Sequence, residues 1–381
     1  GGSALGNLSV QQALRPLTWN FLDPASRKGW MRLFVLDNVD PHWTRDLLGA
    51  LNLKKTLFNV ISKSGTTAEC LANYFIFRDA VARKVGVKRA AKHFVFTTDA
   101  QKGYLRELAV KDKIPAFAVP SNVGGRFSVL SSVGLLSAAC TGVDVLGLLA
   151  GARAMAERCK IASLTENPAA AYAVLQYLYY QKGVKLSVLM PYAQNLRGVA
   201  DWYRQLWAES LGKKADRGGK IVNAGPTPIK ALGATDQHSQ AQLYMEGPYD
   251  KLLTFLSVDQ FDRKTGIPPV DPKHYLSRRS LNELLKAEEQ GTRLALTKAQ
   301  RPNLTISVPE ISPFTLGEIF YLFEVAVAYM GELMNINAFD QPGVELAKVY
   351  TYALMGRGGY ETQRSELDEQ AKRDGQSHYV V

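Results

Sequence analysis

The sequence predicts an α/β protein with two doubly wound domains, each a parallel sheet with helices on both faces, followed by C-terminal helices. Short apolar runs alternate with helical patterns in two series along the chain, which is typical of open parallel sheets. The 381 residues suffice for two domains with complete cores. We expect a first domain at residues 1–150 and a second, with a C-terminal helical segment, at residues 151–381, divided near 145–165.

The first series of apolar runs predicts four strands. Each run is short and continuous, as buried parallel strands are. The runs are residues 33–36, 57–61, 93–96 and 116–119. A helical pattern at residues 69–85 follows the second run, and an Ala- and Leu-rich stretch at residues 129–154 closes the series.

The second series predicts four more strands, at residues 186–189, 220–222, 253–256 and 304–308. Two long helices are also expected. Ser280 opens a polar helix at residues 281–299, and Pro313 precedes an apolar helix that ends near Met334. The tail beyond Gly356 is polar and is expected to fray.

Composition excludes several classes of protein. The chain is 46% hydrophobic and 21% charged, which is ordinary for a globular protein. No apolar run reaches the ~18 residues of a transmembrane helix, so no membrane association is expected. Three cysteines without a CxxC motif predict no disulfides and favour the reducing cytoplasm. The net charge of +11 comes from scattered residues, which favours acidic metabolites over nucleic acid as partners.

A hydroxyl-rich string, Ser62-Lys63-Ser64-Gly65-Thr66-Thr67, stands between a predicted strand and a predicted helix. It offers four hydroxyls, backbone N–H groups and the positive end of a helix dipole to one anion, and Lys63 adds a mobile charge. A compact monophosphate fits these groups, whereas the triphosphate spacing GxxxxGK[ST] is missing. The alternative is an ordinary helix capped by Ser or Thr.

Two glycine-rich turns offer further contacts. In GGSALG, residues 1–6, a tight turn is expected to expose the hydroxyl of Ser3. Ser3 is then either a contact to a phosphate or sugar or a simple turn residue. In GGRFS, residues 124–128, the glycines allow close approach of the backbone to a ligand, and Arg126 could hold an anionic intermediate. The alternative for Arg126 is a salt bridge in a loop.

Three charged or titratable residues stand in patterns that permit catalysis. Glu209 lies at i+4 from Gln205 in a helix at residues 196–211, where a solvated salt-bridge stripe is the alternative. His238 has Thr235, Asp236 and Gln237 beside it to orient an imidazole, although a lone histidine is more often structural. The string Gln341-Pro342-Gly343 interrupts regular structure, and a helix is expected to start one turn before Lys348. The alternative to a catalytic role is that Lys348 is an ordinary surface lysine. No cluster has metal-ligand spacing, so no metal is expected.

Six strings resemble the glucose-6-phosphate isomerase (phosphoglucose isomerase) family and occur in the family's order from residue 1 to residue 348. They are GGSALG, SKSGTTAE, GGRFSVLSSVG, ESLGK, GATDQHSQ and QPGVELAK. The resemblance implies two sugar-isomerase (SIS) domains. It also implies conversion of glucose 6-phosphate to fructose 6-phosphate through a cis-enediolate, without a cofactor.

The resemblance also implies a role for each residue. Glu209 is the base that moves a proton between C2 and C1, and Arg126 stabilises the enediolate. His238 and Lys348 assist ring opening, and His238 is lent by the neighbouring subunit, which implies a homodimer. The residues expected to bind the substrate or its phosphate are Gly2, Ser3, Ser62, Lys63, Ser64, Thr66, Thr67 and Gln205.

The chain departs from the family in some respects. It opens without Met inside the GGS string, so we expect the family's preceding segment, with the first strand of the first sheet, to be missing. Ser64 and Gly65 suit the bacterial branch, and Ala347 stands where Gly is common. Two alternatives remain. A non-catalytic sugar-phosphate-binding SIS regulator would need only the phosphate string, and full matching of ESLGK and DQHSQ disfavours a bifunctional phosphoglucose/phosphomannose isomerase.

Overall fold

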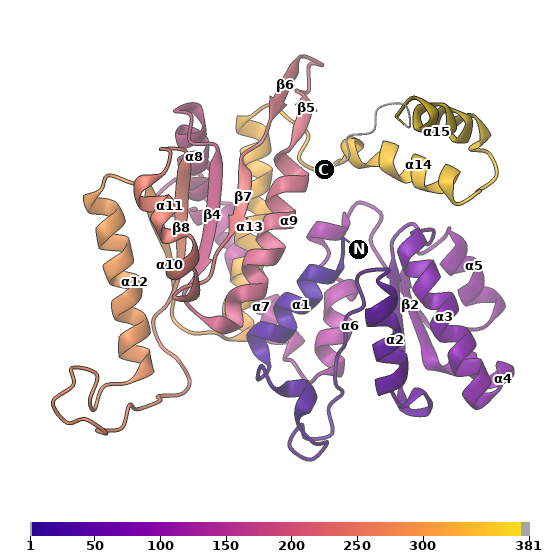
Figure 1. The fold of residues 1–381 in the computed structure, drawn as a ribbon, viewed down its shortest axis with the longest axis horizontal. Helices are drawn as coiled ribbons and strands as arrows, with labels where there is room; N and C mark the ends of the chain where they lie inside the picture. Colours follow the sequence, from indigo (N-terminus) through magenta and orange to yellow (C-terminus); the bar gives the residue numbers. More distant parts are fainter. Residues whose placement is uncertain (1, 375–381) are drawn as a thin grey trace.

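The computed structural model describes residues 2–374 and contains two separate parallel sheets, as predicted (Figure 1). The first sheet has the strand order β1-β2-β3, with β1 (Phe58–Ser62), β2 (Phe94–Thr98) and β3 (Ala116–Ala118). The helices along this part of the chain are α2 (Pro41–Ala50), α3 (Ala68–Val85), α4 (Val87–Ala90) and α5 (Tyr104–Lys111). Because the strands are parallel and in register, Ser62 and Thr98 lie side by side where β1 and β2 end.

The second sheet has the order β7-β4-β8-β9 and is also parallel. Its strands are β4 (Leu186–Pro191), β7 (Thr227–Lys230), β8 (Lys251–Val258) and β9 (Asn303–Val308). One core contains Leu189 and Leu256 and joins α8 (Pro168–Gln181), α9 (Arg197–Leu211) and α13 (Pro313–Leu333). Val188 and Phe255 belong to the core on the other face, with α11 (Ala241–Glu246) and α12 (Leu281–Lys298).

Three helices in the middle of the molecule extend the larger core: α1 (Ala4–Leu14), α6 (Ser132–Cys140) and α7 (Val145–Cys159) (Figure 1). α1 packs on α9 and α6, and α7 packs along α13. The first sheet has a separate core in which Tyr74 meets Phe94 and Phe96 edge-on, with ring centroids 5.2 and 5.3 Å apart. The division into domains near residue 150 stays a prediction.

α13 is, among the described residues, the one helix long and apolar enough to cross a membrane. In the structure 61% of its most apolar window is buried, and it packs against α7, α8 and α9. The core helix of a globular protein has this pattern, because a helix that is apolar all round must be covered on all sides.

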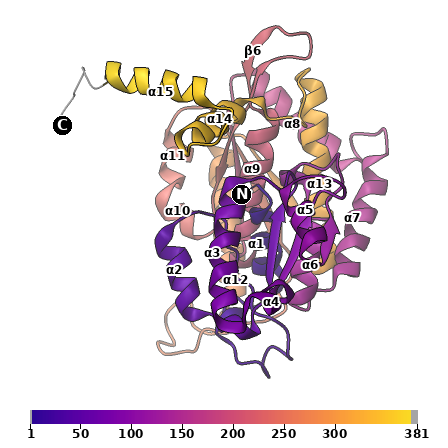
Figure 2. The same ribbon diagram turned by 90° about the vertical axis from the view of Figure 1, so that its right-hand side faces the viewer.

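The last part of the chain forms an arm, residues 342–374, made of α14 (Glu345–Leu354) and α15 (Glu361–Asp374). The two helices pack mainly on each other, and α15 runs away from the body of the molecule (Figure 2). The expectation that the tail frays is wrong as far as Asp374. Arg364 pairs with Asp368 one turn on, and Tyr350 donates to Glu366 at 3.0 Å, which stabilises α15 against α14.

One predicted strand is absent, and another belongs to a different sheet. Residues 33–36 are irregular, because the backbone N–H and C=O of Leu33 bond to the Asn20 side chain instead of a neighbouring strand. Residues 220–222 overlap a real strand, β6 (Ile221–Ala224), but β6 pairs with β5 (Lys213–Ala215) in an antiparallel hairpin and does not belong to the parallel sheet. The parallel strand is β7, which contains Pro228 and lies at the sheet edge, where proline is tolerated.

Candidate active site

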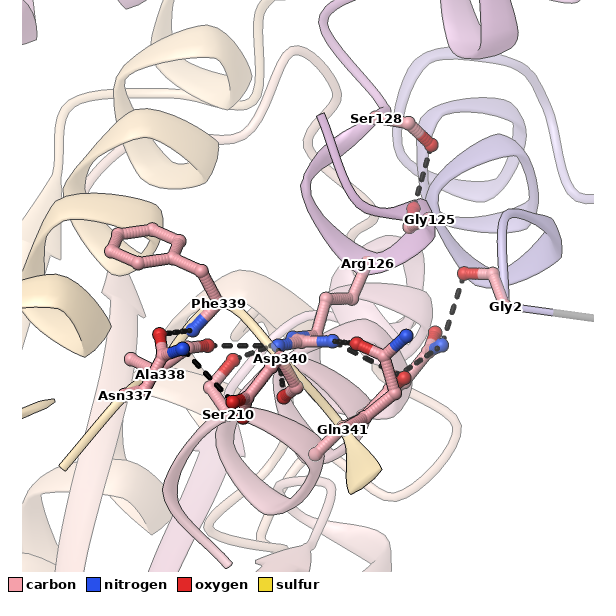
Figure 3. A network of polar contacts seen from close by, with 12 residues as sticks. Gly2, Gly125, Arg126, Ser128, Ser210, Asn337, Ala338, Phe339, Asp340 and Gln341 are labelled. Atoms are coloured by element: carbon pink, nitrogen blue, oxygen red, sulfur yellow. Dashed lines mark hydrogen bonds and ion pairs between the residues drawn. The ribbon is translucent and has the colours of Figure 1, made fainter. Parts of the chain in front are cut away.

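Four segments far apart in the sequence meet around one buried arginine (Figure 3). The arginine is Arg126, in a 3₁₀ turn, Gly125–Phe127, that follows β3; its side chain is 1% exposed. The other three segments are the turn before α1, the last turns of α9 and the stretch at residues 337–341. They bring together Gly2, Ser3, Gln205, Glu209, Ser210, Ala338, Asp340 and Gln341.

Each nitrogen of the Arg126 guanidinium has a partner. Nε donates to Ser210 Oγ at 2.7 Å, and Nη2 donates to the carbonyls of Ala338 and Asp340 at 2.8 and 3.2 Å. Nη1 donates to Gln341 Oε1 at 3.0 Å and lies 3.2 Å from Glu209 Oε1. Burial lowers the pKa of Arg126, and the charges of Glu209 and Asp340 oppose this shift. Since arginine keeps its proton in proteins, the site holds a fixed cation.

Glu209 lies in the last turn of α9 and is held on both carboxylate oxygens. Oε1 faces Arg126, and Oε2 accepts a hydrogen bond from Gln205 Nε2 at 3.2 Å. The same nitrogen donates to the carbonyl of Gly2 at 3.0 Å. The Glu209 side chain is 28% exposed, so a ligand can still reach it. The alternative of a solvated salt bridge on α9 holds for Asp201, which pairs with Lys230 and Arg204. It does not hold for Glu209, whose carboxylate faces Arg126.

The glycines of the two turns allow this close packing. A Cβ on Gly125 would lie 3.3 Å from Ser3 Oγ, and a Cβ on Gly2 would lie 3.2 Å from Gln205 Nε2. Ser3 therefore lies beside the Arg126 turn. Its hydroxyl makes no capping bond to α1. The turn thus places one hydroxyl and one backbone carbonyl next to Glu209 and Arg126.

The predicted phosphate loop, residues 62–67, joins the end of β1 to α3. Ser62 Oγ and Thr67 Oγ1 are 2.7 Å apart, and Ser64 Oγ accepts from the N–H and the hydroxyl of Thr66 at 3.2 and 3.1 Å. Thr67 is the N-cap residue of α3, but its side chain does not cap the helix. The capped-helix alternative is therefore wrong for Thr67, and the first-turn N–H groups of α3 receive no bond from its hydroxyl.

Lys63 is half-buried in this loop, and its backbone carbonyl accepts from Asp99 N–H at 3.1 Å. Gly65 has a φ of +67°, and a Cβ there would lie 3.0 Å from the backbone N of Leu105. The loop therefore depends on a glycine where it passes α5.

The structure does not bring His238 or Lys348 to Glu209 within the chain. His238 is exposed on α10 (Thr235–Ser239), on the α12 side of the second sheet, because Gln237 bonds to Tyr192 and to the Glu288 carbonyl of α12. The expectation that its neighbours orient the imidazole is wrong: Asp236 binds Leu232 N–H and the Ser239 hydroxyl. Lys348 lies on the arm, half exposed, and pairs with Glu345 at 2.8 Å.

Sequence reasoning assigned no role to Ser210, Asp340, Gln341 or Lys213, all of which belong to this cluster. Ser210 and Lys213 stand within ESLGK, and Gln341 opens QPGVELAK, so the recognised strings contained the signal. The contacts of Ser210, Asp340 and Gln341 to Arg126 span 84 to 215 positions and cannot be read from the sequence. Within residues 2–374 no group of His, Cys, Asp and Glu could hold a metal ion.

Comparison with known proteins gives consistent results. A family model described as Phosphoglucose isomerase matches residues 1–264 and 280–372. The glucose-6-phosphate isomerase of Carboxydothermus hydrogenoformans is 51% identical over 371 residues, covering 96% of this chain and 80% of that protein. That of Rubrobacter xylanophilus is 43% identical, covering 94% and 82%.

Solved structures agree with these sequence matches. A crystal structure of a glucose-6-phosphate isomerase from Chlamydia trachomatis is 25% identical, with a TM-score of 0.80, and covers 97% of this chain and 72% of that one. A hypothetical protein from Thermus thermophilus is 40% identical, with a TM-score of 0.85, and covers 93% and 82%.

Proposed function

This chain belongs to the phosphoglucose isomerase family and interconverts glucose 6-phosphate and fructose 6-phosphate, and we propose that Glu209 and Arg126 carry the chemistry. The observation that supports these roles is the 3.2 Å contact between Glu209 Oε1 and a guanidinium that is fully bonded and buried. The reported relatives favour neither a non-catalytic regulator nor a bifunctional phosphoglucose/phosphomannose isomerase.

Aldose–ketose exchange removes a weakly acidic C–H proton and returns it to the adjacent carbon. In the proposed mechanism Glu209 takes the proton from C2 and returns it to C1 on the same face. Glu209 loses its negative charge as the enediolate gains one beside the same cation. Arg126 therefore keeps an anionic partner throughout, and the site needs little reorganisation.

The substrate phosphate is assigned to the loop that contains Ser62, Lys63, Ser64, Thr66 and Thr67. The loop follows β1 and the Arg126 turn comes after β3 of the same parallel sheet, so both segments leave the sheet at the end where its strands finish. Binding energy from the phosphate then positions the carbons that react. Gly2, Ser3 and Gln205 are assigned to the sugar, since they adjoin Glu209.

The assay is conversion of glucose 6-phosphate to fructose 6-phosphate in the presence of EDTA. Turnover at enzyme-like rates is expected, at least about 1 s⁻¹. Binding of the sugar phosphate without turnover would favour the regulator. Comparable turnover of mannose 6-phosphate would favour the bifunctional enzyme.

We propose further that the enzyme is a homodimer in which His238 assists ring opening in the partner's site, together with Lys348. Support comes from the exposure of His238 and from its place across the second sheet from Glu209. Mixing inactive His238→Ala with inactive Glu209→Gln subunits should restore part of the activity, because one hybrid site carries both natural residues. A mixture that stays inactive after proven subunit exchange contradicts the shared site.

The cytoplasm is the proposed location. The three cysteines, Cys70, Cys140 and Cys159, are free, which suits a reducing compartment. Fractionation of the source cells, with the activity followed, would test this.

A further inference from the structure

A second buried cation, besides Arg126, contacts the segment that carries Glu209. Lys213 directly follows the C-cap of α9, and its side chain is 5% exposed. Its Nζ donates to the backbone carbonyls of Glu209 and Ser210, both at 2.9 Å. It also lies 3.7 Å from Asp340 Oδ1, in the segment that binds Arg126.

These bonds hold the backbone of the two residues whose side chains face Arg126. Ser210 is fixed at both ends, since its carbonyl accepts from Lys213 and its hydroxyl accepts from Arg126 Nε at 2.7 Å. Glu209 is likewise held by its carbonyl on one side and by its carboxylate on the other. The last carbonyls of a helix otherwise have no partner in the helix, so this turn would be free to fray.

A cation suits a helix C-terminus, but burying it beside a second cation costs free energy that a solvated lysine would not. Burial lowers the pKa of Lys213, and the positive charge of Arg126 lowers it further, whereas Asp340 and Glu209 oppose the shift. Gly212 N–H already bonds to the Ala208 carbonyl, which ends the helix. Groups that are costly to bury collect at functional sites, which suggests that Lys213 serves the site.

We propose that Lys213 is a positioning residue of the isomerase: by holding the carbonyls of Glu209 and Ser210 it keeps the carboxylate and the hydroxyl of these residues aimed at Arg126. The inference rests on the proposed function. It predicts that loss of the ammonium slows proton transfer and leaves phosphate binding intact, because a base displaced by a fraction of an ångström reacts much more slowly.

The test replaces Lys213 by Met, which keeps the unbranched stem and removes the donor. Lys214→Met is the matched control, because Lys214 is the exposed neighbour on β5 and the charge change is the same. In Lys213→Met, kcat and the exchange of the substrate's C2 hydrogen with deuterated water should both fall by about tenfold or more. The dissociation constant of glucitol 6-phosphate, which has no carbonyl to isomerise, should change by less than about threefold.

Partial rescue separates positioning from folding. Lys213→Gln can still donate to one carbonyl and should recover part of kcat; it replaces the Met variant if that protein does not fold. A Lys213→Met enzyme that is less stable but keeps the natural kcat, or one that loses glucitol 6-phosphate binding in equal measure, overturns the inference. An inactive natural enzyme contradicts the proposed function instead, so the two failures are distinguishable.

Discussion

The proposed phosphate loop and the Arg126 cluster are built in different ways. The loop is six consecutive residues between a strand and a helix, and its hydroxyls bond to one another over at most five positions. The cluster joins four segments, and Arg126 bonds to residues 76 to 215 positions away. A local site needs only its own backbone conformation, whereas the cluster exists only when the larger core is packed.

The loop and the cluster are also expected to have different tasks, because they carry different groups. The loop presents hydroxyls and N–H groups, which can hold an anion without a buried charge of their own. The cluster holds Arg126 and Lys213 against Glu209 and Asp340, so removing one member leaves the others unpaired. Changes in the cluster should therefore affect turnover most, and changes in the loop should affect affinity.

Glu209→Gln should have the largest effect. An amide cannot accept the C2 proton at neutral pH, so kcat should fall by about 10²-fold or more. Affinity for glucitol 6-phosphate should stay nearly unchanged, because the anion is assigned to the loop. Exchange of the C2 hydrogen in deuterated water isolates the proton step from ring opening. The control is Glu157→Gln, an exposed carboxylate paired with Lys160 on α7. A Glu209→Gln protein that exchanges this hydrogen at the natural rate would falsify the assignment.

Arg126→Lys should have the next largest effect. Lysine keeps the charge but cannot reproduce the fork of bonds to Ser210, Gln341 and the two carbonyls. We expect kcat to fall by about 10- to 100-fold, with a lower midpoint of unfolding, since some acceptors are left without a donor. Arg217→Lys is the control, because Arg217 pairs with Glu332 at the surface. An Arg126→Lys enzyme with natural kcat would show that the charge alone suffices.

The same contrast explains what the sequence could predict. β1, the loop and α3 were predictable, because an apolar run, a hydroxyl string and a helical pattern follow one another. The role of Glu209 came only from the resemblance, whereas the glycine turn around Arg126 already suggested a site for an anionic intermediate. The contact between them depends on chain packing between distant segments, and the spacing on α9 by itself favoured a solvated salt-bridge stripe.

The errors in strand assignment have local causes. Residues 33–36 have the composition of a strand. However, the side chain of Asn20 bonds to the backbone N–H and C=O of Leu33, which therefore do not pair with a neighbouring strand. β7 was missed because Pro228 interrupts a run that is only four residues long. In both cases a single residue, Asn20 or Pro228, decides the outcome, and the pattern of apolar residues does not reveal its effect.

Ser64→Asp tests the loop. Aspartate can still accept from Thr66 N–H, as Ser64 does at 3.2 Å, so the loop can keep its conformation while it gains a negative charge. Repulsion of the phosphate should weaken substrate binding by more than about tenfold, or ~1.4 kcal/mol. The measurement is the dissociation constant of glucitol 6-phosphate. Thr165→Asp, at an exposed position between α7 and α8, is the control for net charge. Unchanged affinity in Ser64→Asp places the phosphate elsewhere.

Gly65→Ala should have the smallest effect, and it asks whether the loop is as local as its hydrogen bonds suggest. Gly65 has a φ of +67°, and its Cβ would lie 3.0 and 3.2 Å from the backbone N atoms of Leu105 and Tyr104. Gly356 also has a positive φ, +71°, but no atom lies within 4 Å of its Cβ. Both alanine variants should lose about 1 kcal/mol of unfolding free energy to the backbone conformation. Gly65→Ala should lose more, because the start of α5 must move, and its affinity for glucitol 6-phosphate should drop as well. Equal losses in urea unfolding, with affinity unchanged in both, would mean that the loop does not depend on α5 and that strand β1 and helix α3 alone hold it.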